Sequence, residues 1–178
     1  MDKILLVDDE PHVLRALSRG LRAHLPQDVA LEMHHDPFKA AQRLQEHRFA
    51  VIVSDFRMPR MNGIELLREA RIHQPLATRM ILSASSEVST IMQALNDVEV
   101  FRYLSKPWEI PRLAAQLDVA LRRHHALHTQ QELADAMQVL RGQMSAQAAE
   151  LRRLEAEEPG ITQVNWGPMG EVLMPPLS

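Results

Sequence analysis

Through about the first 125 residues, short apolar runs alternate with amphipathic segments. The runs at 4–7 and 50–53 are hydrophobic at every position, which is typical of strands buried on both faces of a parallel sheet. The pattern predicts strands at 3–8, 29–34, 50–55, 79–84 and 99–104. It predicts helices at 11–25, 37–47, 63–73 and 87–96, with a fifth helix that begins near residue 109. This alternation favours an α/β fold in which helices cover both faces of a doubly wound, five-stranded parallel sheet.

The predicted fifth helix has no stop signal before residue 159, because the chain from Leu113 to Glu158 contains no proline and only one glycine. Within it, a seam of mostly apolar residues recurs at alternating spacings of four and three: Leu133, Met137, Leu140, Met144, Gln147, Leu151 and Leu154. This spacing is typical of a coiled coil, so we expect a helical arm at 126–158, continuous with the fifth helix, that forms a homodimer. The charges beside the seam do not select a parallel or an antiparallel pair. A two-helix hairpin that folds back on the first domain is the alternative.

Pro159 and Gly160 are expected to end the arm. The segments 161–166 and 171–174 lie on either side of a Gly/Pro-rich loop, which favours a β-hairpin at 159–178. The sequence therefore predicts three parts: a domain at 1–125, a helical arm at 126–158 and a hairpin tail at 159–178.

Composition narrows the classes of function. The 178 residues include no cysteine, which excludes disulfides and thiolate chemistry. The N-terminus does not resemble a signal peptide and no segment has the length of a membrane span, so we expect a soluble cytoplasmic protein without a membrane partner. Residues 126–178 carry three basic and seven acidic side chains, which leaves this tail at −4 and the first 125 residues at +1. A tail without a basic face argues against a nucleic-acid partner.

Acidic side chains follow two of the predicted strands. Asp8 and Asp9 come after the first apolar run, and Asp55 ends the strand at 50–55. The carboxyl ends of parallel strands meet at one edge of the sheet, so these carboxylates are expected to lie together. Crowded carboxylates need a cation, and their hard oxygens suit Mg²⁺.

Three further residues at this edge complete a phosphoryl-transfer site. Asp55 is the candidate nucleophile, since a carboxylate can form an acyl phosphate. Lys106 would supply a mobile positive charge, and Ser83 a hydroxyl that donates to a phosphoryl oxygen. Pro107 favours a cis peptide bond that would set the direction of the lysine.

The histidines raise the question of a second metal site. His124 and His128 have the i, i+4 spacing of helical ligands, and His125 lies between them. No cysteine or carboxylate partner accompanies them in the sequence, so we interpret them as part of a polar helix surface.

Four motifs occur in order at the ends of the predicted strands: Leu6-Val7-Asp8-Asp9-Glu10, Ser54-Asp55-Phe56-Arg57-Met58-Pro59 with Gly63, Ile81-Leu82-Ser83-Ala84, and Tyr103-Leu104-Ser105-Lys106-Pro107. On these motifs, residues 1–125 resemble the receiver domain of two-component response regulators. The resemblance implies a flavodoxin-like fold with strand order 2-1-3-4-5 and Mg²⁺-dependent phosphorylation of Asp55 by a histidine kinase. It implies metal ligation by Asp9, Asp55 and the Arg57 backbone carbonyl, with Asp8 acting mainly through water. Ser83 and Tyr103 match the pair of residues that switches conformation on phosphorylation.

Trp108, directly after Lys106-Pro107, makes the segment similar to receivers attached to HD-GYP or hydrogenase-type regulators, although neither output domain is present here. Arg57 and Ser85 occupy positions that influence hydrolysis of the phosphoryl group in this family. The resemblance implies a response regulator phosphorylated by a sensor histidine kinase or a histidine phosphotransfer protein. It would signal through an unknown protein target or through dimer rearrangement, with no enzymatic activity beyond its own phosphorylation and dephosphorylation. The alternative is a phosphorelay intermediate or phosphate sink, with the tail as a scaffold.

Overall fold

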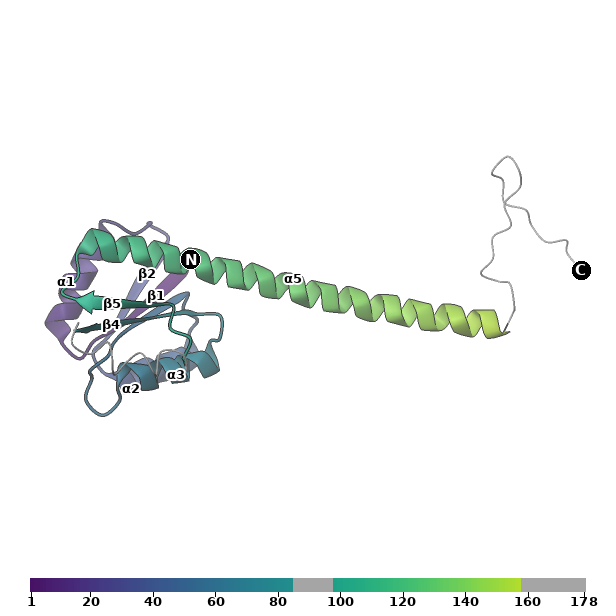
Figure 1. Ribbon diagram of the computed structural model, residues 1–178, viewed down its shortest axis with the longest axis horizontal. Helices are drawn as coiled ribbons and strands as arrows, with labels where there is room; N and C mark the ends of the chain where they lie inside the picture. The colour runs from purple at the N-terminus through teal and green to yellow at the C-terminus, as the bar shows by residue number, and fades with distance from the viewer. Residues whose placement is uncertain (85–97, 158–178) are drawn as a thin grey trace, which may run out of the picture. The chain divides into compact units, whose positions relative to one another are not determined.

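The computed structural model describes residues 1–84 and 98–157, with side chains described to residue 154. Its centre is a parallel sheet of five strands in the order β2-β1-β3-β4-β5 (Figure 1). The strands are β1 (Asp2–Val7), β2 (Val29–His34), β3 (Val51–Asp55), β4 (Thr78–Ala84) and β5 (Arg102–Lys106). The predicted flavodoxin-like fold and strand order are confirmed.

The first four strands lie within one residue of their predicted bounds, but β5 begins three residues later than predicted. The reason is the backbone just before it. Glu99 has φ 50, a left-handed conformation that a strand does not contain. The side chain of Arg79 also donates to the carbonyl of Val98 at 2.8 Å, which turns the chain before it enters the sheet. Val98 is fully buried nonetheless, so a strand-like apolar pattern in the sequence reflects burial there and not extended backbone.

The helices of the described residues are α1 (Pro11–Arg22), α2 (Pro37–Glu46), α3 (Gly63–His73) and α5 (Ile110–Glu157). Side chains cap two of them: Asp36 accepts from the Phe38 backbone N–H, and Asn62 forms a reciprocal capping box with Glu65. Helix α1 ends three residues before its predicted end, because the backbone N–H groups of His24 and Leu25 both turn back to the carbonyl of Leu21. The helix predicted at 87–96 and the hairpin predicted at 159–178 lie outside the described residues.

Two apolar layers enclose the sheet. Helices α2 and α3 cover one face, and α1 with the first part of α5 covers the other (Figure 1). Strand side chains alternate between the layers: Ile4 and Leu6 of β1 face α1 and α5, whereas Leu5 and Val7 face α2 and α3. Every residue of β3 is buried, as its uninterrupted apolar pattern predicts. The functional residues therefore stand at the end of a rigid central strand.

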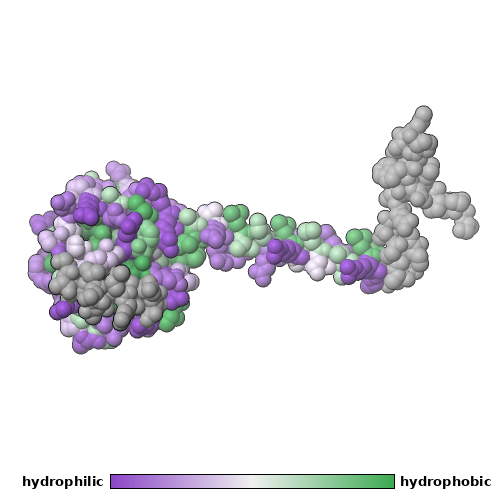
Figure 2. All heavy atoms as spheres, in the orientation of Figure 1, coloured by the Kyte–Doolittle hydropathy of each residue, from purple (hydrophilic) through white to green (hydrophobic). Residues whose placement is uncertain are grey.

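Helix α5 is a single helix of 48 residues, with no interruption between Ile110 and Glu157. The turn that a two-helix hairpin would require is therefore absent from this stretch, and that alternative is wrong. By its internal contacts the chain divides into Met1–Thr129, here called the first unit, and Gln130–Ser178, the second unit. The described part of the second unit exposes large apolar side chains, among them Leu133 at 58%, Leu140 at 58% and Met144 at 68% (Figure 2). Nowhere in the described residues is a helix both long enough and apolar enough for a membrane span.

Candidate functional site

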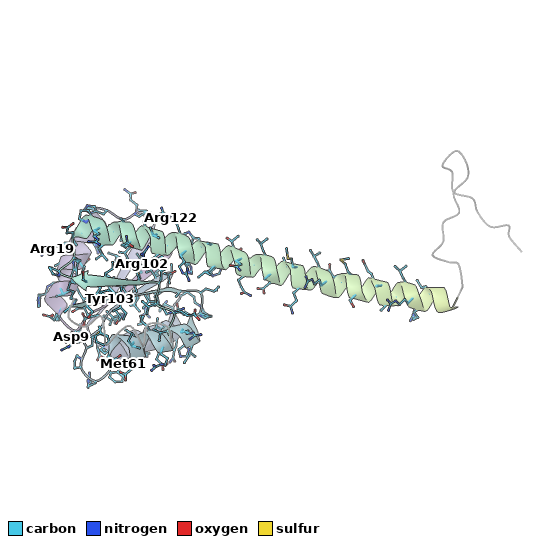
Figure 3. The ribbon with its side chains drawn as sticks, in the orientation of Figure 1. Asp9, Arg19, Met61, Arg102, Tyr103 and Arg122 are labelled. Carbon is cyan, nitrogen blue, oxygen red and sulfur yellow. The ribbon has the colours of Figure 1, made fainter. Side chains whose placement is uncertain are left out.

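The carboxyl ends of the strands bring the predicted site residues to one edge of the sheet. Parallel pairing sets Val7 beside Ser54, Asp55 beside Leu82, and Ala84 beside Lys106. Asp8 follows β1 and is 1% exposed, while Asp55 ends β3 and is 5% exposed. Asp9 follows Asp8 at this edge and is half-buried (Figure 3). Two carboxylates that are nearly inaccessible to solvent thus occupy adjacent strand ends.

Lys106 connects the two buried carboxylates. Its Nζ donates to Asp8 Oδ2 at 2.8 Å and forms a closer ion pair with Asp55 Oδ1. The second oxygen of Asp8 accepts from the Glu10 backbone N–H at 3.0 Å, so both oxygens of this carboxylate have a donor. The peptide bond between Lys106 and Pro107 is cis, as predicted. The Trp108 ring lies on another side of the ammonium, with its centroid 5.5 Å from Nζ.

Burial governs the electrostatics of this cluster. It raises the pKa of Asp55 above its ordinary value, and the charge of Asp8 acts in the same direction, while Lys106 opposes both. Burial alone would lower the pKa of Lys106, but hydrogen bonds to Asp55 and Asp8 outweigh it and raise that pKa. Lys106 therefore stays charged beside the two buried carboxyl groups.

The donor set fits a hard divalent cation. Carboxylate, carbonyl and water oxygens are the ligands that Mg²⁺ prefers. Within residues 1–84 and 98–157, no three acidic or histidine side chains are grouped so that they could hold a metal by themselves. A cation at this edge would therefore also take backbone or water oxygens. The ligands predicted from the sequence, with the Arg57 carbonyl and a water-mediated Asp8, form a set of that kind.

The predicted switch residues belong to neighbouring strands, Ser83 to β4 and Tyr103 to β5. The Tyr103 hydroxyl donates to the carbonyl of Ala84 at 3.0 Å and is 3.3 Å from that of Ser83. The Ser83 side chain is buried, and Ser83 is paired in the sheet with Ser105, the residue before the lysine. Tyr103 is thus tied to the strand end that carries the candidate hydroxyl.

The loop after β3 is held by contacts that the sequence analysis missed. Ser54 Oγ donates to the Asp55 carbonyl at 2.9 Å, and the Phe56 N–H donates to the Leu82 carbonyl at 2.9 Å. The Gly63 N–H donates to the Phe56 carbonyl at 2.9 Å, which ties the start of α3 to this loop. Gly63 belongs to the second of the four motifs, but its packing against Asp55 has no signature in a single sequence. These contacts fix the backbone that presents Asp55.

Buried polar side chains at the opposite edge of the sheet were also missed. Arg79 is 4% exposed and donates to the carbonyls of Val98, Ala77 and Pro75. Its burial lowers the pKa of the guanidinium. A charged residue inside an otherwise apolar strand was the available signal. Arg79 supports the fold and does not contact the site.

The histidines of α5 lie within Met1–Thr129 and contact residues near this opposite edge. His124 Nδ1 lies 2.9 Å from the Leu76 carbonyl, and His125 Nε2 lies 2.8 Å from Asp2 Oδ2. A cavity of about 570 Å³ occurs here, lined by residues that include Arg48, His73, His124 and His128. None of the predicted site residues lines it, so it is separate from the Asp55 cluster.

The geometry agrees with what known proteins show. Residues 4–118 match the family described as response regulator receiver domain. The hydrogenase transcriptional regulatory protein HoxA of Bradyrhizobium diazoefficiens is 32% identical over 118 residues, which cover 66% of this chain and 24% of HoxA. The response regulator MprA of Mycobacterium ulcerans is 31% identical over 121 residues, covering 68% of this chain and 50% of MprA. The chain thus spans at most about half the length of these two relatives.

Solved structures give the same result. The signal receiver domain of an HD domain-containing protein from Pseudomonas fluorescens Pf-5 superposes with a TM-score of 0.65 at 32% identity, over 72% of this chain and 92% of that one. The family match covers more than half of the 178 residues. This chain belongs to the response regulator receiver domain family.

Proposed function

We propose that this protein is a response regulator that accepts a phosphoryl group on Asp55 from a sensor histidine kinase or a histidine phosphotransfer protein. The observation that carries the proposal is the contact of one ammonium, Lys106, with two buried carboxylates, Asp8 and Asp55, at the carboxyl edge of the sheet. In the family to which the chain belongs, this edge is where phosphoryl transfer takes place. We expect the protein to act in the cytoplasm.

The transfer step follows from the positions of these side chains. An Asp55 carboxylate oxygen attacks the phosphorus of a phosphohistidine, the phosphorus–nitrogen bond breaks, and an acyl phosphate forms on Asp55. Lys106 is already paired with Asp55, so its charge stands where the phosphoryl oxygens arrive. A Mg²⁺ ion held by Asp9, Asp55 and the Arg57 carbonyl, with Asp8 acting through water, would neutralise the remaining charge. Burial of Asp55 keeps competing water away from the nucleophile.

Ser83 and Tyr103 would report the new phosphate. In the described structure Tyr103 is hydrogen-bonded to the Ala84 carbonyl, next to Ser83. A Ser83 hydroxyl drawn toward the phosphoryl group would disturb this end of β4 and release the tyrosine. The result would be a changed surface around β5 and the start of α5, which a protein target could bind.

The arm is the proposed second route of output. Its seam of exposed apolar residues supports a homodimer, because side chains such as Leu133, Met137 and Leu140 are more than half exposed in the single chain. Since α5 is continuous from the first unit into the arm, phosphorylation would change how two arms pair.

The test combines phosphorylation with solution mass. The full chain is incubated with Mg²⁺ and acetyl phosphate, and intact-mass spectrometry measures phosphoryl incorporation in wild type, Asp55→Asn and Asp28→Asn, the last an exposed acidic control. We expect one phosphoryl group in wild type and in the control, and none in Asp55→Asn. Equal incorporation in all three would refute the assignment of Asp55.

Light scattering with Mg²⁺ and beryllofluoride then tests the output. A change of mass or hydrodynamic radius in wild type, absent from Asp55→Asn, supports signalling through the arm. An unchanged protein that exchanges phosphate rapidly with a histidine phosphotransfer protein would indicate the relay or sink role instead.

A further inference from the structure

Trp108 lies against the ammonium group of the candidate site. Its ring centroid is 5.5 Å from Lys106 Nζ, inside the range in which a cation is attracted to an aromatic face. The ammonium therefore has three neighbours, namely the carboxylates of Asp8 and Asp55 and this ring. Both Lys106 and Trp108 are only partly exposed, which strengthens the attraction relative to a contact in open solvent.

The ring is held in place from its other side. Trp108 packs against the apolar layer that α1 and α5 form on one face of the sheet. Lysine, in contrast, has a flexible four-carbon stem. A reaction that must first order this side chain is slowed by the loss of conformational entropy, unless the ammonium is already held in place. A fixed ring beside the ammonium reduces the set of positions that the lysine side chain occupies.

Trp108 also stands directly before α5. The helix begins at Ile110, and the Glu109 carbonyl accepts from the Leu113 N–H in its first turn. Ile110 packs so closely on α1 that a β-carbon added to Gly20 would lie 2.7 Å from its side chain. Trp108 and Ile110 both pack against the same apolar layer, so a shift of the indole ring would act on the packing that holds the start of α5.

We propose that Trp108 is a positioning residue for Lys106, whose ring holds the ammonium toward Asp55 and passes a movement of the lysine to the start of α5. This inference rests on the proposed phosphorylation of Asp55. When a phosphoryl group on Asp55 draws the ammonium away from Asp8, the distance between Lys106 Nζ and the Trp108 ring changes. The ring then either moves with the ammonium or no longer contacts it.

A double-mutant cycle tests the positioning role. The initial rate of phosphorylation by acetyl phosphate with Mg²⁺ is measured for wild type, Trp108→Leu, Trp108→Phe, Lys106→Met and the Lys106→Met/Trp108→Leu pair. We expect Trp108→Leu to slow phosphorylation about three- to tenfold, and Trp108→Phe to restore most of the rate because it keeps an aromatic face. On the Lys106→Met background, Trp108→Leu should cause no further loss. Equal losses on both backgrounds would mean a merely structural role and would overturn the proposal.

Phe101→Leu is the matched control. Phe101 belongs to the same apolar layer, but its ring lies near the guanidinium groups of Arg102 and Arg123, at 5.3 and 5.0 Å. Its loss should lower the midpoint of unfolding as Trp108→Leu does and leave the phosphorylation rate within about twofold of wild type. A rate loss equal to that of Trp108→Leu would assign the effect to packing and contradict the proposal.

Fluorescence tests the contact without phosphorylation. The chain has two tryptophans, and Trp166→Phe leaves Trp108 as the single emitter. We expect the emission of Trp108 to change when Lys106→Met is added, and beryllofluoride with Mg²⁺ to shift it only while Lys106 is present. If the emission of Trp108 is the same with and without Lys106, the proposed contact between the two side chains is refuted. Emission that responds to Lys106 in a protein that is never phosphorylated on Asp55 would confirm the contact, and would refute both the proposed function and the positioning role.

Discussion

The α-carbon of Gly63 packs directly against the backbone carbonyl of Asp55. A β-carbon at position 63 would lie 2.1 Å from that oxygen and 3.0 Å from Ser54 Oγ, which itself donates to the same carbonyl. Real β-carbons do not approach a carbonyl oxygen so closely. The start of α3 therefore defines where the backbone of Asp55, the proposed phosphoacceptor, lies.

Gly63→Ala should accordingly displace Asp55. We expect a loss of about 1–3 kcal/mol in the free energy of unfolding, because an inserted methyl group in a close-packed site forces the backbone to move. The initial rate of phosphorylation by acetyl phosphate should fall about tenfold or more, since small displacements of a nucleophile have large effects on rate. Urea titration and intact-mass kinetics measure the two quantities. A stable variant with an unchanged rate would show that the contact does not position Asp55.

Two other glycines form a matched pair in helices. Gly142 in α5 has no heavy atom within 4 Å of an added β-carbon, so Gly142→Ala should stabilise the helix by about 0.5–1 kcal/mol. Gly20 in α1 has the same gain in helix propensity, but its β-carbon would meet Ile110 at 2.7 Å. Gly20→Ala should therefore lower the free energy of unfolding. Thermal melts followed by circular dichroism test the pair, and changes of the same sign in both variants would contradict the packing argument.

The ion pair of Glu32 with Arg43 should make the free energy of unfolding decrease at acidic pH. Arg43 Nε lies 2.6 Å from Glu32 Oε1, and this hydrogen bond is the main cause that lowers the pKa of Glu32 from 4.5 to about 2. The folded protein keeps Glu32 ionised to lower pH than the unfolded chain does. The resulting stability is fully present above pH 4.5 and is lost as the pH falls toward 2.

Glu32→Gln should therefore reduce the free energy of unfolding at neutral pH by about 1–2 kcal/mol, allowing for a side chain that is partly open to solvent. The difference from wild type should shrink as the pH falls from 4.5 to 2. Chemical denaturation at a series of pH values provides the measurement, with Asp28→Asn as the exposed control. A difference that stays constant over this interval would mean that the ion pair contributes nothing to folding.

Arg79 should be far more important for folding than an average arginine. Its guanidinium donates to four backbone carbonyls, including that of Gln74 at 3.5 Å, and lies 3.4 Å from Glu99 Oε2, with the side chain only 5% exposed. Arg79→Met leaves these buried carbonyls without donors, so we expect a loss on the order of 3 kcal/mol in the free energy of unfolding. Arg15→Met, at an exposed position of α1, should stay within about 0.5 kcal/mol of wild type. Similar effects of the two substitutions, measured in urea, would refute this.

The arm offers a strict test of the proposed dimer. Leu140 lies on the predicted seam and Val139, its neighbour, lies off it, yet their exposed fractions are 58% and 61%. Leu140→Lys should raise the dimer dissociation constant about tenfold or more, whereas Val139→Lys should leave it unchanged. Sedimentation equilibrium measures both. A wild-type monomer at high concentration, or equal weakening by the two substitutions, would exclude the seam as an interface.

Much of the fold was predictable because burial in a parallel sheet leaves a strong trace in sequence. The runs that became β1 and β3 are apolar throughout, and the acidic residues that follow them mark the edge where Asp8 and Asp55 meet Lys106. The start of β5 was missed because a buried Val98 and a left-handed Glu99 depend on Arg79, a residue distant in sequence. Hydrophobic periodicity records whether a side chain is buried, and it does not record the direction of the backbone.

The candidate site, like the fold, was predictable from the sequence only in part. Carboxylates and a lysine at strand ends are recognisable as residue types, and their meeting follows from parallel topology. The contact of Trp108 with Lys106 and the packing of Gly63 on Asp55 depend on backbone directions over a few residues, which no single sequence states. The predicted metal ligands remain a prediction that awaits titration with Mg²⁺.

Lys106 is 98 residues away from Asp8 along the chain, and it belongs to β5, which lies at one margin of the sheet and is the last of its five strands in sequence. A ribosome-bound chain that has not yet reached this lysine already contains both carboxylates, but it has no ammonium to place between them. Under the proposed function, each molecule therefore becomes able to accept phosphate only at a late stage of its synthesis. Incomplete or truncated copies are not phosphorylated, and they do not compete with complete copies for phosphoryl groups.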